Sequence, residues 1–375
     1  MRNEALNVGQ VSQSGQESSR VAKQRRVRDF LDAKELDGIL LKLQSNFAWY
    51  TDGARGHVNL ASEESIAEIL VTRTDEHLFV NSIEHQRLLT EEIEWRIPNV
   101  HIHSWWDVSQ SKRFLKDSRL RRVETDAGVL RGEFARLRFS LLPDEVGRYK
   151  KLGSDVAGSL WETAQLVRAG MTEFDLAAEL SLRMTRQGIS PLTLLVAFDE
   201  RTRAYRHPLP TKKVLKNIAI VSVCGRRSGL VVSASRMIAC NTITADVRAR
   251  QSAVSSIDAW LLQNTLPGVR IADLFDGLIR QYAKHGYPTE WHLHHQGGAT
   301  GYTTRDFKAS SSSEEVVLNN QAFAWNPTIT GTKSEDTILV NKKGFEILTF
   351  DARWPAASHD VNGSSVKRPG ILTLD

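Results

Sequence analysis

Apolar positions in the first third of the chain follow a helical pattern and then a strand pattern. After residue 19 they are spaced for one face of a helix, at Val21, Val27, Phe30 and Leu31. The run 37–43 is almost wholly apolar and predicts a buried strand. Further strands are predicted at 66–71 and 77–80, and a helix at 82–94. This part is therefore expected to be an α/β domain.

A long helix is predicted from Pro143, because a proline followed by Asp144 and Glu145 suits a helix N-terminus. Its apolar positions recur every three or four residues as far as Ala164 and form one buried stripe. Thr172 predicts the cap of a second helix, with Asp175 placed to reach back to it. A new domain is therefore expected to begin at residue 143.

The rest of the chain mixes strands and helices without strict alternation. Strands are predicted at 192–198, 218–223, 229–234, 321–330, 334–340 and 346–350, and helices at 245–266 and 271–285. This order favours an α+β domain with a curved, mostly antiparallel sheet. The predicted organisation is a mobile polar tail (1–19), the α/β domain (20–142), the α+β domain (143–352) and an exposed C-terminal tail (353–375).

Composition narrows the classes of protein. The chain has 375 residues, 41% of them hydrophobic, and no apolar run long enough to cross a bilayer, so a disordered or membrane-spanning protein is not expected. Its net charge is only +5, and the basic cluster within 20–28 is more typical of a solvated helix face than of a nucleic-acid surface. Two cysteines and a start without a secretion signal favour the cytoplasm.

Several motifs in the second half stand in a distinctive order. They are VRAGMTEFDLA at 167–177, GLVVSASR at 229–236, HHQGGATG at 294–301, WNP at 325–327 and EDTILV at 335–340. In sequence and order these motifs resemble those of the creatinase, prolidase and aminopeptidase P group. The segment NFAWYTDG at 46–53 is similar to a strand and turn in that group's N-terminal domain.

The resemblance implies a creatinase-type N-terminal α/β domain followed by a pita-bread domain of α+β class. It also implies a homodimer, and a small molecule as substrate. Metallopeptidases of the group hold two divalent ions with two Asp, one His and two Glu. Carried over by motif, those five positions are Ser222, Ser233, Gly298, Asn326 and Glu335.

Only one carboxylate therefore remains at the five metal-ligand positions. Two hydroxyls, a glycine and an amide bring no negative charge to offset two divalent ions, which require anionic oxygen ligands. The sequence predicts that the pair of ions is absent, that no cofactor is needed, and that the emptied cavity holds substrate between Ser222, Ser233, Gly298 and Asn326.

His207 is the strongest catalytic candidate, because its position resembles that of the catalytic histidine of creatinase, which works without metal. Glu335 is the second. If Glu335 is buried with no metal beside it, its pKa would be raised and it could act as an acid, whereas a structural glutamate bonded to a neighbouring backbone amide is an equal alternative.

His292, His294 and His295 form a third candidate group. Strand-like alternation would place His292 and His294 on one side and His295 on the other. A histidine-rich tract can indicate zinc, but the companion acids are missing. The favoured interpretation assigns His294 to catalysis and His295 to substrate contact.

Arginine and cysteine side chains offer further possibilities. Arg236, or its neighbours Arg226 and Arg227, could bind a substrate carboxylate. In creatinase-like dimers a first-domain loop reaches the partner's pocket, which makes Arg55 a candidate for substrate contact. Cys224 is a minor candidate nucleophile.

These features together predict a metal-independent, creatinase-like hydrolase or lyase that cleaves a C–N bond of a small polar molecule. Two alternatives remain. The first is a non-catalytic binding or scaffold protein that keeps the pita-bread domain, and the second is an Xaa-Pro type peptidase whose ligands come from other residues.

Overall fold

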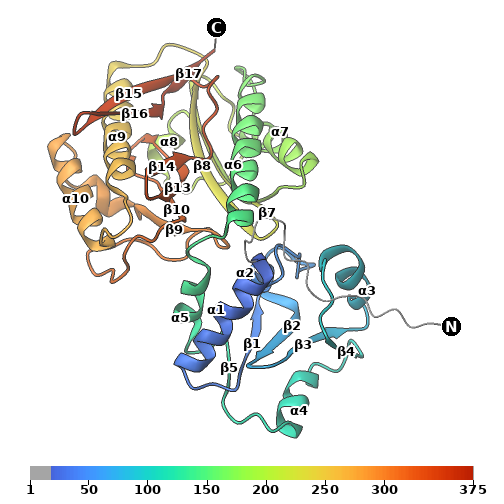
Figure 1. Cartoon of the computed structure of the whole chain (residues 1–375). Coiled ribbons are helices and arrows are strands. Elements are labelled where there is room, and N and C mark those ends of the chain that lie inside the picture. The colour runs from blue at the N-terminus through green and yellow to red at the C-terminus, as the bar shows by residue number, and fades with distance from the viewer. Residues whose placement is uncertain (1–17, 375) are drawn as a thin grey trace. The chain divides into compact units, whose positions relative to one another are not determined.

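The computed structural model describes residues 18–374 and divides into two compact units, Met1–Leu137 and Arg138–Asp375 (Figure 1). The division falls at Leu137/Arg138, close to the predicted boundary at 142/143. Most of the predicted N-terminal tail (1–19) lies outside the described residues. Its last residue, Ser19, begins helix α1 (Ser19–Ala33), which Ser18 caps by accepting a hydrogen bond from the backbone N–H of Val21.

The first unit is an α/β domain around a five-stranded sheet of order β4-β3-β2-β1-β5. Strand β2 pairs antiparallel with β1 and β3, whereas β4 and β5 run parallel to their neighbours. The strands are β1 (Gly38–Leu43), β2 (Glu64–Thr72), β3 (Glu76–Asn81), β4 (Asn99–His103) and β5 (Val123–Thr125).

Short helices surround this sheet. After α1 they are α2 (Gln44–Tyr50), α3 (His85–Arg87), the π-helical turn η1 (Leu88–Glu92), α4 (Gln110–Asp117), α5 (Arg131–Ala135) and the 3₁₀ turn η2 (Arg136–Arg138). The helix predicted at 82–94 is thus reduced to α3 and η1. Apolar side chains of Leu40, Leu70 and Phe79 pack together from three strands and stabilise the sheet.

The second unit begins with the two helices that the capping signals predict. Helix α6 (Pro143–Ala164) has proline in its first turn, and Glu145 accepts a hydrogen bond from the Leu142 backbone N–H at 2.8 Å. Helix α7 (Glu173–Arg186) has a capping box between Thr172 and Asp175. The remaining helices are α8 (Arg201–Ala204), α9 (Ala245–Asn264), α10 (Ile271–Lys284) and the 3₁₀ turn η3 (Glu290–Leu293).

Two four-stranded sheets of the second unit meet where the candidate site lies. Their orders are β17-β8-β7-β6 and β14-β13-β10-β9, and all neighbours are antiparallel except β17 and β8. An isolated bridge between Ser235 and Glu335 links one sheet to the other. The strands are β6 (Ser190–Phe198), β7 (Ile218–Arg227), β8 (Leu230–Ala239), β9 (Gly297–Thr300), β10 (Gln321–Trp325), β13 (Asp336–Asn341), β14 (Gly344–Ile347) and β17 (Ile371–Thr373).

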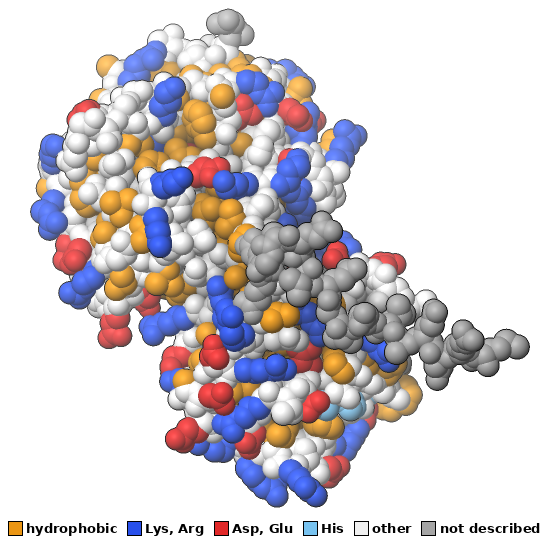
Figure 2. Space-filling model, viewed as in Figure 1, with side chains coloured by type: hydrophobic (Ala, Val, Ile, Leu, Met, Phe, Trp, Pro, Cys, Tyr) orange, Lys and Arg blue, Asp and Glu red, His pale blue; other side chains and the backbone are white. Residues whose placement is uncertain are grey.

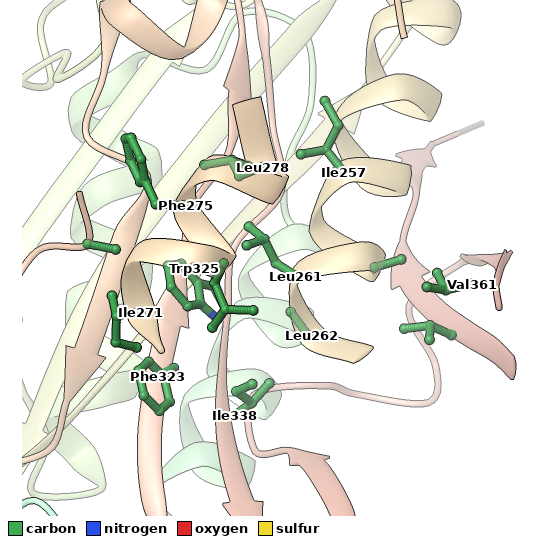
Figure 3. Packing of buried hydrophobic residues seen from close by; sticks show 14 of the residues in the cluster. Ile257, Leu261, Leu262, Ile271, Phe275, Leu278, Phe323, Trp325, Ile338 and Val361 are labelled. Atoms are coloured by element: carbon green, nitrogen blue, oxygen red, sulfur yellow. The ribbon is translucent and has the colours of Figure 1, made fainter. Parts of the chain in front are cut away.

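Helices α9 and α10 cover the sheet that contains β10 and bury the main apolar cluster against it (Figure 3). Phe323 and Trp325 stack with their ring centroids 5.6 Å apart. The Trp325 indole donates to Thr265 Oγ1 at 3.0 Å, so its one polar atom is satisfied in the core. This packing confirms the predicted α+β class of the second domain.

The prediction of an exposed C-terminal tail at 353–375 is wrong. A hairpin of β15 (Ala356–Val361) and β16 (Ser364–Pro369) packs on α9, and β17 extends the sheet of β8. Arg368 is fully buried and forms ion pairs with Asp258 and Asp336. Its carboxylate partners are distant in sequence, so local composition gave no sign that this segment is an ordered part of the domain.

The basic cluster in 20–28 does not form an open charged surface. Lys23 is buried and pairs with Asp52 at 2.5 Å, and Arg20 pairs with Glu76 at 3.1 Å. Over the face drawn in Figure 2, basic side chains are dispersed among acidic and apolar ones. Within residues 18–374, no helix has the length and apolarity needed to cross a membrane.

Candidate active site

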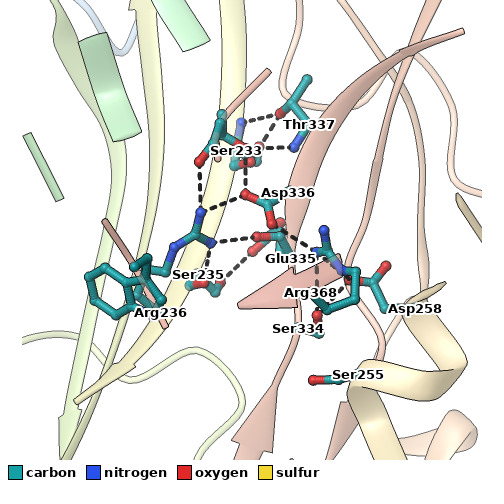
Figure 4. A network of polar contacts seen from close by, with 12 residues as sticks. Ser233, Ser235, Arg236, Ser255, Asp258, Ser334, Glu335, Asp336, Thr337 and Arg368 are labelled. Carbon is teal, nitrogen blue, oxygen red and sulfur yellow. Dashed lines mark hydrogen bonds and ion pairs between the residues drawn. The ribbon is translucent and has the colours of Figure 1, made fainter. Parts of the chain in front are cut away.

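The structure brings together three of the predicted metal-position residues in the second unit. Ser222 on β7 and Ser233 on β8 are buried, and Glu335 directly precedes β13. The hydroxyl of Ser235 lies 2.6 Å from Glu335 Oε2 (Figure 4) and 2.6 Å from Ser222 Oγ. A hydroxyl has one proton, so Ser235 donates to the Glu335 carboxylate while Ser222 donates to Ser235.

Two cationic side chains neutralise Glu335. Arg305 Nη2 lies 2.8 Å from Oε1 and Lys333 Nζ lies 2.9 Å from Oε2. Burial opposes ionisation, but the charges of Lys333 and Arg305 outweigh it and lower the pKa of Glu335 to about 2. The prediction of a raised pKa for Glu335 is therefore wrong. At neutral pH this residue is an ionised partner of two cations and has no proton to donate.

Three histidines form a cluster beside this ion-paired carboxylate. His207 and His294 meet through their Nε2 atoms at 2.9 Å, and the rings of His294 and His295 stack with centroids 4.4 Å apart. Burial and the nearby Lys333 lower the pKa of His294 to about 2, while burial and Arg305 lower that of His295 to about 4. The pKa of His207 is also lowered, by burial and Lys333. All three imidazoles are therefore neutral at pH 7.

The predicted alternation across 292–295 is wrong, because Glu290–Leu293 forms the 3₁₀ turn η3 instead of a strand. His292 is exposed and stacks on Trp291, with ring centroids 3.7 Å apart. His294 and His295 instead both lie next to His207. Two histidines adjacent in sequence thus share one cluster.

Gly298 and Asn326 complete the positions carried over from the family. A Cβ atom built on Gly298 would lie 2.2 Å from the Phe307 carbonyl oxygen, so this backbone leaves no room for a histidine side chain. Asn326 is buried, and its backbone N–H donates to the Gln296 carbonyl. Gly298 therefore contributes backbone alone, whereas Asn326 brings an uncharged amide.

These residues do not fit a pair of divalent ions. One carboxylate is present, and both of its oxygens are already occupied by Arg305 and Lys333. The three histidines offer nitrogen atoms within 4.8 Å of one another, which suits a single ion by donor type. However, Lys333 and Lys308 lie close enough to lower the pKa of His207, and the same positive field opposes a bound cation.

The structure gives Arg236 a structural environment instead of the predicted substrate contact. Its guanidinium is buried and donates to Asp336 Oδ1 at 2.8 Å, to the Thr349 carbonyl at 2.6 Å and to the Ser235 carbonyl at 2.8 Å (Figure 4). Because these partners accept hydrogen bonds from the guanidinium group and solvent cannot reach it, Arg236 is not available to a ligand.

The minor candidates have local partners. Arg227 pairs with Asp155 at 2.8 Å, and Cys224 Sγ lies 3.2 Å from Ser233 Oγ. In the first unit, Arg55 forms a bidentate contact with Glu92 and remains 64% exposed. A substrate contact by Arg55 across a dimer therefore stays a prediction.

Sequence reasoning missed Arg305 and Lys333, the two residues that set the charge of the site. Lys333 precedes Glu335 by two residues, and the period of a strand puts such a pair on one side. That spacing was a usable signal. Arg305 lies in an irregular segment after β9, where no local pattern indicates the direction of its side chain.

Comparison with known families settles the relationship. Residues 151–342 match the sequence profile of metallopeptidase family M24. The chain belongs to this family. Its members are peptidase-type hydrolases, so the resemblance to the creatinase, prolidase and aminopeptidase P group is confirmed. None of the curated protein sequences compared matches the chain.

Solved structures of M24 type share the whole fold at low sequence identity. An Xaa-Pro dipeptidase from Bacillus anthracis is 16% identical with a TM-score of 0.76, covering 95% of this chain and 100% of its own. A prolidase from Pyrococcus horikoshii OT3 is 18% identical with a TM-score of 0.73, covering 88% and 99%. The N-terminal domain of the FACT complex subunit SPT16 from chickpea (Cicer arietinum) is 12% identical with a TM-score of 0.62, covering 88% and 95%. At these identities the likeness establishes the fold alone.

Proposed function

We propose that this M24 protein is a hydrolase that cleaves a C–N bond of a small polar molecule without the family's pair of divalent ions. The observation that supports the proposal most is the pairing of Glu335 with Arg305 and Lys333 beside three uncharged histidines. Fixed cations supply the positive charge that the metallopeptidases take from their ions. Neutral imidazoles supply the base.

His207 is the group suited to accept a proton. It is exposed, so water and substrate can reach it, and its lowered pKa keeps it uncharged at neutral pH. The ring nitrogen that does not contact His294 takes a proton from water as the water oxygen bonds to the substrate carbon. The same proton then passes to the nitrogen as the C–N bond breaks, which regenerates the neutral imidazole.

The other groups position the His207 ring or stabilise charge on the substrate. His294 is buried and holds the His207 ring through their Nε2 contact. Negative charge that develops on the substrate during attack is stabilised by the cationic Lys333 and Arg305. We further propose that the protein works in the cytoplasm as a homodimer, in keeping with its two free cysteines and its family.

A non-catalytic binding protein is the second candidate. It is favoured by the contacts of Glu335, whose oxygens are both occupied by side chains of the same chain, as in a purely structural network. The fold shared with the SPT16 domain gives this candidate a structural precedent. The Xaa-Pro peptidase alternative has less support, because it requires metal ligands that these positions do not provide.

A substrate screen combined with metal analysis tests the proposal. Purified protein treated with a chelator is assayed for release of ammonia or amine from guanidino, amidino and cyclic amide compounds, with proline dipeptides in parallel. We expect turnover of one of the first three classes that is unchanged by the chelator. Two equivalents of manganese, zinc or cobalt, together with dipeptide cleavage, would establish the peptidase alternative instead.

A further inference from the structure

The buried network around Glu335 carries more positive than negative charge. Its cations are Arg236, Arg305, Lys333 and Arg368, and its carboxylates are Asp258, Glu335 and Asp336. Four positive charges thus face three negative ones. Acidic residues near this network, Asp306, Glu290 and Asp351, are paired with Arg138, Arg206 and Arg353.

An excess positive charge at this depth calls for an anion. The side chains of Lys333 and Arg305 are each only 9% exposed, and an uncompensated charge out of water costs several kcal/mol. Lys333 has three N–H donors, and Glu335 is the one ion-pair partner that the described residues offer it. The ammonium group therefore retains donors for a ligand.

A cavity leads to this ammonium group. Its walls include Lys333, Arg206 and Ser222, the hydroxyl-bearing Thr202 and Thr332, and apolar residues from β6 and β7. None of its lining residues within the described chain is acidic. The interior is narrow, with room for about one water molecule. Such a space admits one end of a ligand, such as a single carboxylate oxygen, and leaves the rest of the ligand outside it.

Unpartnered polar atoms lie around the same cluster. Arg305 Nε, His294 Nδ1 and Asn326 Oδ1 are buried without a hydrogen-bond partner among the described residues. Buried polar atoms are almost always paired with protein, water or ligand. These three residues do not line the cavity, so their atoms indicate polar groups from outside the chain beside it, whereas the cavity itself is assigned through Lys333.

We propose that this cavity binds the carboxylate of a small, singly charged molecule, with Lys333 as its main electrostatic contact. Of the five positions carried over from the family's metal ligands, only Ser222 lines this cavity, so the proposed anion site lies beside those positions. This inference rests on the proposed function in one respect, since it gives the C–N substrate a carboxylate group.

Binding of simple probes tests the proposal. Calorimetry at pH 7.5 and low salt compares acetate with its uncharged analogue acetamide and with inorganic phosphate. We expect acetate to bind, and to bind at least tenfold more tightly than acetamide or phosphate. Equal binding of acetate and acetamide would overturn the anion site, and equal binding of phosphate would overturn the carboxylate class.

Substitutions at Lys333 test whether acetate binds at this residue. Lys333→Met is expected to weaken acetate binding at least tenfold, Lys333→Arg to retain it, and Lys150→Met, on the surface of α6, to leave it unchanged. If Lys333→Met does not fold, the pair Lys333→Met with Glu335→Gln removes both charges and serves as the second variant. Wild-type acetate affinity in either folded variant would overturn the assignment of Lys333.

His207→Ala separates this inference from the proposed function. Acetate binding is expected to survive that substitution. Acetate binding in a wild-type protein that turns over none of the screened compounds would refute the hydrolase and keep the anion site. Turnover without acetate binding would refute the anion site and keep the hydrolase.

Discussion

The two sides of the candidate site differ in how far their polar groups are satisfied. On the carboxylate side, Glu335 has a partner on each oxygen, from Arg305, Lys333 and Ser235. On the histidine side, His294 has an unpaired Nδ1 and His207 is open to solvent. The first side has the character of a structural network, whereas the second keeps groups that can still accept a proton.

Under the proposed function, the difference illustrates how a centre can stay charged without metal ions. Two side-chain cations neutralise the one carboxylate. Burial keeps the neighbouring imidazoles neutral, and the same positive charges add to this effect, because protonation there would add like charge. Chemistry on the histidine side is therefore coupled to structure on the carboxylate side.

Replacing His207 by Ala should give the largest effect. If His207 is the base, turnover of the substrate found in the screen should fall by about 10²–10⁴-fold, with little change in stability because the side chain is exposed. Steady-state kinetics measures the loss. His292→Ala is the matched control, since His292 is exposed and outside the cluster. Unchanged turnover in His207→Ala would show that another residue is the base.

Replacing Arg368 by Met should cause the largest loss of stability. The change leaves Asp258 buried without its ion-pair partner, which costs about 3–5 kcal/mol in free energy of unfolding. Urea denaturation measures it. Arg353→Met removes an exposed arginine that pairs with Asp351, and should change stability by less than about 1 kcal/mol. A similar small change for Arg368 would mean that the C-terminal hairpin is dispensable.

Replacing Arg305 by Met connects the two sides directly. Because Arg305 is a main electrostatic cause of the low pKa of His295, its removal should raise that pKa from about 4 toward the ordinary value. NMR titration of the histidine C–H signals follows the change, with Lys150→Met as a control far from the network. An unshifted His295 would show that burial alone sets its pKa.

The smallest effect concerns the pH dependence of stability. The unfolded chain binds protons at its histidines below about pH 6.5, whereas His295 stays neutral in the folded protein down to about pH 4. Stability should therefore fall as the pH is lowered from 6.5 toward 4. Urea denaturation at pH 7 and pH 5 should give a smaller difference for His295→Gln than for wild type. Equal differences would exclude His295 as a contributor.

Much of the fold was predictable because its signals are local. The caps at Pro143 and Thr172, and the apolar runs of β1, β7 and β8, depend on residues close together in sequence. The prediction of one helix at 82–94 was wrong, because apolar spacing cannot distinguish a long regular helix from the short α3 and η1. The C-terminal hairpin was not predicted, because Arg368, which anchors it, pairs with residues 110 and 32 positions earlier in the sequence, Asp258 and Asp336.

The sequence by itself determined the family, the order of most elements and the presence of one carboxylate among the five positions carried over from the family's metal ligands, because each depends on residue type at a position in a motif. Only the tertiary structure decided the charge of the site. Arg305 and Lys333 approach Glu335 from different segments, and the sign of a pKa shift depends on distances between side chains. Those distances are properties of the packed fold, which no motif contains.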